Sequence, residues 1–195
     1  VIVERGGQPR AVALPGTPIG EPSSAGDNLY QYTRSADGSR AVTLVGPTGA
    51  ISTVLPGEPT DTFVDQATGT VLVVSAPTAE THAVTVVSLA GASTVELAES
   101  TPIFRQTDDG SLFAFTNSQF GYTSVVVIRT DGTTSTVRLG GSLVDAAEVQ
   151  RNTLAIRTIT GAGTQALMAL KSDGTSRVTT FSGTPIGDVV GNPDG

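Results

Sequence analysis

A pattern of four short extended runs, returning about every 42 residues, is the feature that most constrains this chain. Thr-Pro occurs at Thr17-Pro18, Thr101-Pro102 and Thr184-Pro185, so its spacings are 84 and 83 residues, about twice 42. Pro59-Thr60 and Ser142-Leu143 stand near the two halfway points. The sequence therefore predicts four consecutive repeats, with bounds at 17–57, 58–99, 100–141 and 142–183.

The third repeat shows the pattern most clearly, because runs of β-branched and aromatic residues alternate there with turn residues. The runs are Ile103–Gln106, Leu112–Thr116, Val125–Ile128 and Thr134–Leu139. Asp131-Gly132 separates the last two runs and favours a hairpin turn, since glycine adopts positive φ without a Cβ clash. Val125–Ile128 is apolar on both faces and is expected inside a sheet, whereas Thr134–Leu139 alternates and is expected nearer solvent.

Four strands in each repeat of about 42 residues are typical of β-propeller blades. The predicted fold is therefore all-β, a β-propeller or a propeller segment. It would contain four to five blades, each a four-stranded antiparallel sheet. We expect residues 1–195 to form a single repeat domain.

The two ends of the chain resemble incomplete repeats. Residues 1–16 are predicted to be the end of a blade, with strands over Val1–Glu4 and Arg10–Leu14, and residues 184–195 to be the start of a blade. Together they could supply a fifth blade, although one strand is then still lacking. A fragment of a longer propeller is the favoured interpretation, with other domains of a longer parent chain beside it.

Composition and charge argue against several classes of function. The net charge is −7, and the 11 basic residues are spread singly, so no basic patch is expected to bind nucleic acid. No apolar run approaches the ~18 residues that a membrane-spanning helix needs, so no membrane span is predicted. The chain has no cysteine, which excludes disulfides and thiolate metal sites.

The segment Gly16-Thr17-Pro18-Ile19-Gly20-Glu21-Pro22, with its partial copy from Gly183, resembles propeller-type repeats of large secreted actinobacterial proteins. Many of those proteins are mycobacterial and carry Ig-like or cadherin-like domains. The resemblance implies an extracellular or cell-surface location. Asp109–Phe115 is more loosely similar to NHL-type and streptogramin-lyase-like propellers, because Asp-Gly precedes an aromatic strand. Those lyases are expected to use histidine and a metal, whereas this chain has a single histidine, His82.

Few residues suggest catalysis. His82 is expected in a connection between two strands, and a histidine without partners is more often passive than a base or ligand. Acidic residues recur early in the repeats and could converge to bind Ca²⁺ or act as an acid–base pair. They are Asp61, Asp65, Asp108, Asp109, Asp145, Glu148 and Asp188. Aspartate in turns is the commoner role, so no catalytic residue, cofactor or metal site is predicted.

Aromatic residues give the best candidate for a binding site. Phe120 and Tyr122 flank Gly121 at a predicted strand connection. If exposed, they would anchor a protein partner or stack on a glycan; otherwise they fold back over their own blade. Tyr30 and Tyr32 share one face of a predicted strand, where packing is the expected role.

These observations favour a non-enzymatic extracellular interaction or scaffold module of a larger secreted or surface protein, with protein or glycan as partner. One alternative is an enzyme of lyase or glycosidase type, with its site in the central channel of a complete propeller. The other alternative is a purely structural spacer.

Overall fold

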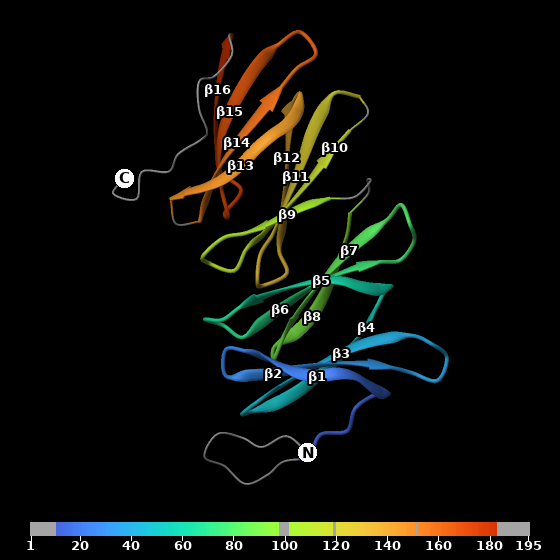
Figure 1. Cartoon of the computed structure of the whole chain (residues 1–195). Helices are drawn as coiled ribbons and strands as arrows, with labels where there is room; N and C mark the ends of the chain where they lie inside the picture. Colours follow the sequence, from blue (N-terminus) through green and yellow to red (C-terminus); the bar gives the residue numbers. More distant parts are fainter. Residues whose placement is uncertain (1–10, 98–101, 119, 151, 183–195) are drawn as a thin grey trace. The chain divides into compact units, whose positions relative to one another are not determined.

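The computed structural model describes residues 11–97, 102–118, 120–150 and 152–182 (Figure 1). These residues form β-strands joined by turns, and none of them lies in a helix, so the all-β prediction is confirmed. Accordingly, this part of the chain contains no helix able to cross a membrane.

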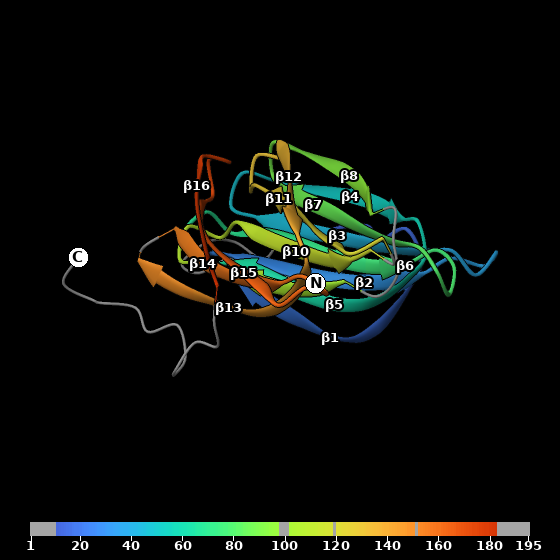
Figure 2. The same ribbon diagram turned by 90° about the horizontal axis from the view of Figure 1, so that it is seen from above.

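Four antiparallel sheets contain four strands each, and in every sheet the strands follow one another in chain order. Figure 2 shows this order for the first sheet, where β1 and β4 form the two edges. The strands of the first two sheets are β1 (Thr17–Ala25), β2 (Asn28–Arg34), β3 (Arg40–Gly46), β4 (Gly49–Leu55), β5 (Glu58–Asp65), β6 (Thr70–Ala76), β7 (His82–Ser88) and β8 (Gly91–Leu97). Those of the other two are β9 (Ile103–Gln106), β10 (Leu112–Asn117), β11 (Tyr122–Ile128), β12 (Thr134–Gly140), β13 (Ser142–Gln150), β14 (Thr153–Ile159), β15 (Thr164–Lys171) and β16 (Ser176–Ser182).

The hairpin predicted at Asp131-Gly132 is present between β11 and β12. Gly132 has φ of 83°, and the Arg129 amide donates to the Thr133 carbonyl over 2.9 Å. A residue with a side chain adopts this backbone conformation at a cost, which explains the glycine. Ile128 pairs with Thr134 directly beyond the turn, so the turn sets the register of the whole strand pair.

Burial follows the predicted pattern of inner and outer strands. Every residue of β3 is buried, as are the five central residues of β7. β12 instead alternates exposed and partly buried residues. β3 and β7 are therefore covered on both faces of their sheets, while β12 keeps one polar face toward solvent. β15 is also an inner strand but differs, since Thr164, Ala169 and Lys171 are exposed.

The strands group into two compact units, with β1–β8 in the first and β9–β16 in the second. The core of the first unit forms between its two sheets. Val42 and Leu44 on β3 share one face, and Val71 and Val73 on β6 share the face that packs with them. A single sheet of this kind cannot bury its apolar face alone, so each sheet depends on its neighbour.

The second unit has a core with larger side chains. Phe113 and Phe115 on β10 are 0% and 2% exposed, and Val127 and Val125 lie directly opposite them on β11. They pack in one cluster with residues of the next sheet, namely Leu154, Ile156, Met168 and Leu170. The aromatic run that sequence placed in the third repeat is thus the centre of this core.

The glycines directly before the first strands of three sheets have a steric role that the repeat pattern alone did not explain. A Cβ on Gly57 would lie 2.3 Å from the carbonyl oxygen of Ala76, and one on Gly16 would lie 2.4 Å from that of Arg34. Gly141 meets the backbone of Ile159 in the same way. The start of each of these sheets therefore lies against the end of its own second strand, at a distance that leaves no room for a side chain.

The structure differs from the expectation at the N-terminal side. Residues 11–14 form no strand, so the predicted strand over Arg10–Leu14 is wrong in its described part. Pro15 follows this segment directly and lacks the amide that a strand ladder requires. The rest of that predicted blade end (1–10), residues 98–101, and the predicted blade start (184–195) lie outside the described residues.

Candidate functional site

Phe120 lies on a tight turn between β10 and β11 and is 79% exposed. The Ser118 amide donates to the Tyr122 carbonyl over 2.8 Å, and the Gly121 amide donates to the Ser118 carbonyl over 3.1 Å. The Phe120 amide also donates to Ser118 Oγ over 3.0 Å. A large apolar ring thus projects into solvent from a hydrogen-bonded backbone rather than folding back over its sheet.

Tyr122 has a different environment from Phe120. It is partly buried at the start of β11, and the Arg138 guanidinium lies 5.3 Å from the centre of its ring. Arg138 pairs with Ser124 on the adjacent strand, so the two-residue offset places the cation over the ring. The turn therefore presents an exposed phenylalanine next to a tyrosine–arginine pair.

Tyr30 and Tyr32 pack against the core of the first unit, as their spacing predicted. Their rings meet edge to face with centroids 5.9 Å apart. The Tyr32 hydroxyl lies 2.7 Å from Thr62 Oγ1 on β5, which links the two sheets of this unit. Burial raises the pKa of Tyr32 to about 12, because the phenolate would lose its hydration.

The acidic residues have separate structural places. Asp61 lies on β5, Asp145 and Glu148 lie on β13, and Asp65 and Asp109 accept hydrogen bonds in turns. Asp65 accepts hydrogen bonds from the Ala67 amide and Thr68 Oγ1, and Asp109 accepts them from Thr107 Oγ1 and the Ser111 amide. Burial works against ionisation of Asp109, but hydrogen bonds from Ser172, Thr107 and Ser111 outweigh it and lower its pKa. Among the described residues no three His, Asp or Glu side chains come together in a group that could hold a metal ion. Asp188 lies outside them.

His82 is the first residue of β7, so its predicted place in a connection is wrong. It pairs with Leu97 on β8, which extends the strand by one residue at this end. Its Nδ1 atom is buried without a hydrogen-bond partner in the described part of the chain.

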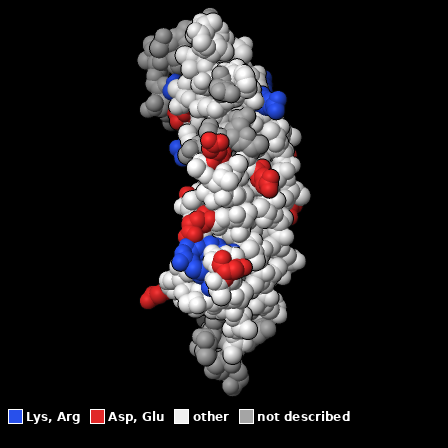
Figure 3. Space-filling model, turned by 90° about the vertical axis from the view of Figure 1, so that its right-hand side faces the viewer, with Lys and Arg blue, Asp and Glu red and all other residues white. Residues whose placement is uncertain are grey.

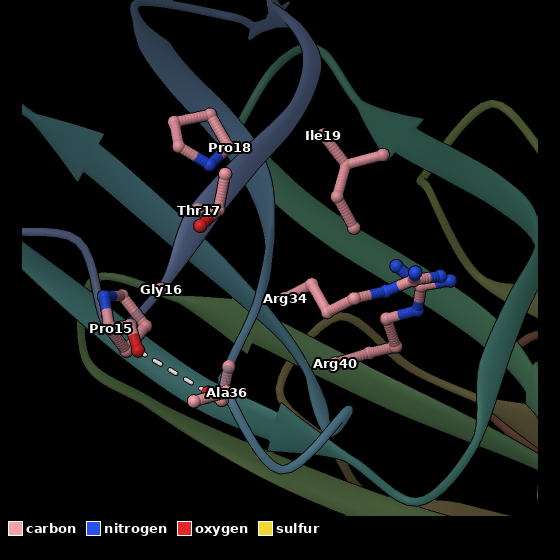
Figure 4. Close-up of a pocket in the computed structure, with 9 residues that line it drawn as sticks. Pro15, Gly16, Thr17, Pro18, Ile19, Arg34, Ala36 and Arg40 are labelled. Carbon is pink, nitrogen blue, oxygen red and sulfur yellow. Dashed lines mark hydrogen bonds between the residues drawn. The ribbon is translucent and has the colours of Figure 1, made fainter.

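A pocket of about 790 Å³ lies at one end of the first sheet. Figure 4 shows its walls, which come from the start of β1, the β2–β3 turn and two arginines. Thr17, Pro18 and Ile19 line it from β1, and Ser35 Oγ closes one side by donating to the Pro15 carbonyl over 3.3 Å.

Arg34 and Arg40 are direct cross-strand partners in this pocket. Figure 4 shows their side chains running in the same direction, with the guanidinium groups next to each other. Arg40 is 9% exposed and donates from Nε to Glu58 Oε2 over 2.6 Å, with a second bond from Nη2 to Oε1. On the surface in Figure 3, basic side chains gather in one main group with acidic side chains beside it.

The sequence analysis did not single out these arginines. The signal was available, because Arg34 and Arg40 flank the turn sequence Ser35-Ala36-Asp37-Gly38-Ser39 symmetrically. A three-residue loop over 36–38, with Gly38 at φ of 88°, pairs Ser35 with Ser39 and places Arg34 opposite Arg40. The pocket itself depends on β1 and on Glu58 of the next sheet, and the hairpin alone does not predict them.

No protein-family model matches the sequence, and no curated protein matches it. Among solved structures, the chain is similar to the crystal structure of an uncharacterized protein, lmo1340, from Listeria monocytogenes EGD-e. The two are 10% identical with a TM-score of 0.36, over 80% of this chain and 63% of that one. The chain thus spans less than two thirds of that structure.

Proposed function

We propose that this chain is a non-enzymatic interaction module of a larger secreted or cell-surface protein, with the Phe120 turn as its contact to a protein partner. The supporting observation is the 79% exposure of Phe120 on a turn fixed by backbone hydrogen bonds. Ordering this turn at an interface costs little conformational entropy, because its backbone is already hydrogen-bonded.

The neighbouring side chains are of the kinds that dominate binding energy in protein interfaces. Tyrosine and arginine are enriched at hot spots, and here Tyr122 and Arg138 already lie in contact. A lone exposed phenylalanine can also stack on a sugar, so a glycan is the alternative partner that the experiment must separate.

The test is selection of peptides from a random library on the immobilised whole chain, in parallel with a glycan array. We expect peptides that bind the wild type and lose binding with Phe120→Ala. Val54→Ala is the matched control, since Val54 is 63% exposed but lies on β4 of the first unit. If a glycan binds and its binding is lost with Phe120→Ala, the partner of this turn is a glycan and not a protein. Peptides indifferent to Phe120→Ala, or turnover on a hydrolase and lyase substrate panel, would contradict the proposal.

We also propose that the four sheets are blades of a β-propeller or of a propeller segment. The meander order of each sheet and the stacking of sheet faces within each unit support this. Small-angle scattering tests closure, because a compact chain of this length has a radius of gyration of roughly 16 Å, and an open segment has a larger one. An experimental structure with sheets not arranged about a common axis would disprove it.

A further inference from the structure

We propose that the pocket at the end of the first sheet binds a small anionic ligand through Arg34 and Arg40. The ligand class is a carboxylate or phosphate group attached to a small apolar body. This site lies in the first unit and is independent of the Phe120 turn, so it extends beyond the proposed protein contact.

The first argument is the register of the strands, which places the two arginines opposite each other. Thr17 pairs with Arg34, and Arg34 pairs with Arg40, so the three residues cross β1, β2 and β3 side by side. Directly opposed residues of neighbouring strands point to the same face, and like charges there are destabilising. Two guanidinium groups in this arrangement therefore repel each other, and a bound anion would relieve the repulsion that remains after Arg40 pairs with Glu58.

The second argument is that the fold does not need this pair. In the other unit, the last pair before the corresponding turn is Asn117 with Thr123 in one sheet and Ile159 with Gln165 in the next. Neither pair is charged, yet both sheets form the same meander. The arginine pair is thus a departure from the repeat, placed where the pocket opens.

The third argument is charge. Glu58 accepts two hydrogen bonds from Arg40 and so compensates one of the two cations. Among the described residues, no carboxylate lies within 4.0 Å of the Arg34 guanidinium. Arg34 is exposed and lines the pocket, so its planar guanidinium is accessible to a ligand. Such a group binds carboxylate or phosphate oxygens through paired N–H donors.

The other residues that line the pocket indicate the chemistry of the part of the ligand that is not anionic. Pro18 and Ile19 are apolar, and Ile19 is 39% exposed. Thr17, the cross-strand partner of Arg34, adds a hydroxyl to the lining. The volume of about 790 Å³ lies within the range of ~300–1,000 Å³ that small-molecule sites occupy. An anion with an attached ring or short chain fits this combination better than a bare ion.

The test is a titration of the whole ¹⁵N-labelled chain with benzoate, with phenyl phosphate, and with benzamide as the neutral match. We expect one or both anions, at concentrations up to about 20 mM, to shift the backbone amide signals of Thr17, Ile19 and Arg34. Benzamide should shift them far less. A response to benzoate alone, or to phenyl phosphate alone, supports the site and identifies the anionic group it takes.

Three variants test whether anion binding depends on Arg34. Arg34→Gln should weaken anion binding about tenfold or more, since one charge-assisted contact is lost. Arg177→Gln, an exposed arginine on β16, makes the same charge change elsewhere and should leave binding as in the wild type. Phe120→Ala should also leave it unchanged. Benzamide shifts equal to those of the anions, unaltered binding in Arg34→Gln with native circular dichroism, or no shift with either anion would overturn the proposal.

Discussion

Arg40 on β3 holds Glu58 on β5 in a two-bond ion pair that joins the two sheets of the first unit. The residues are 18 positions apart in the chain, and Glu58 opens the second sheet where Arg40 opens the third strand of the first. The side chain of Glu58 is 62% exposed while that of Arg40 is 10% exposed. The pair therefore forms at the edge of the contact between the sheets, where the carboxylate remains hydrated.

Glu58→Gln should destabilise the chain at neutral pH and have less effect in acid. The hydrogen bond from Arg40 lowers the pKa of Glu58 below its ordinary value of 4.5. A lowered folded pKa means that the contribution is present above pH 4.5 and is lost as the pH falls through the folded value. Urea unfolding of wild type and variant, at neutral pH and below pH 4.5, measures the difference. Glu96→Gln, at an exposed position on β8, is the control; an equal loss there would contradict the prediction.

The raised pKa of Tyr32 predicts that the folded chain loses stability at alkaline pH. Burial raises its pKa from 10.0 to about 12, so the folded state keeps the proton longer than the unfolded state does. Its contribution is therefore complete below pH 10 and is lost as the pH rises toward about 12. The unfolding free energy of the wild type should fall more steeply across this interval than that of Tyr32→Phe. Parallel slopes for the two proteins would show that this phenol is not responsible.

Two phenylalanines in the second unit should respond in opposite ways to removal of the ring. Phe113 is fully buried, and Phe113→Ala should lower the free energy of unfolding by about 3–5 kcal/mol through lost transfer energy and a residual cavity. Phe120 is exposed, and Phe120→Ala should change it by no more than about 0.5 kcal/mol. Denaturant unfolding of both variants is the measurement. A large loss for Phe120→Ala would mean that its ring packs against the protein.

Replacing Gly57 and Gly91 by alanine should have different effects on stability, because only Gly57 lies too close to another backbone segment for a Cβ. A Cβ at position 57 would lie 2.3 Å from a backbone carbonyl oxygen, so Gly57→Ala should cost about 1–3 kcal/mol as the sheet start shifts away. A Cβ at position 91 would meet nothing within 4 Å, so Gly91→Ala should be neutral or stabilising by up to about 1 kcal/mol. Thermal or urea unfolding of the matched pair tests this. Equal effects would refute the close approach at Gly57.

The candidate sites show where prediction from sequence ends. The turn with Phe120 was recognised from Gly121 and its flanking aromatics, but whether the ring is exposed depends on what packs around it. Tyr122 illustrates this, because it shares the turn and yet is covered in part and paired with Arg138. Likewise the acids Asp65 and Asp109 were recognised as turn residues, and their partners within the turns lie a few positions away. The hydrogen bond from Ser172 to Asp109 comes from a distant part of the chain and was not predicted.

The sequence by itself determined the strands, their turns and their fourfold return, because strand alternation and turn chemistry are properties of neighbouring residues. Only the tertiary structure decided which faces meet and which distant side chains touch. Arg40 with Glu58, Tyr32 with Thr62 and Gly57 with Ala76 all depend on how one strand or sheet lies against another. Contacts of this kind are set by the stacking of whole sheets, whose geometry no short stretch of residues specifies.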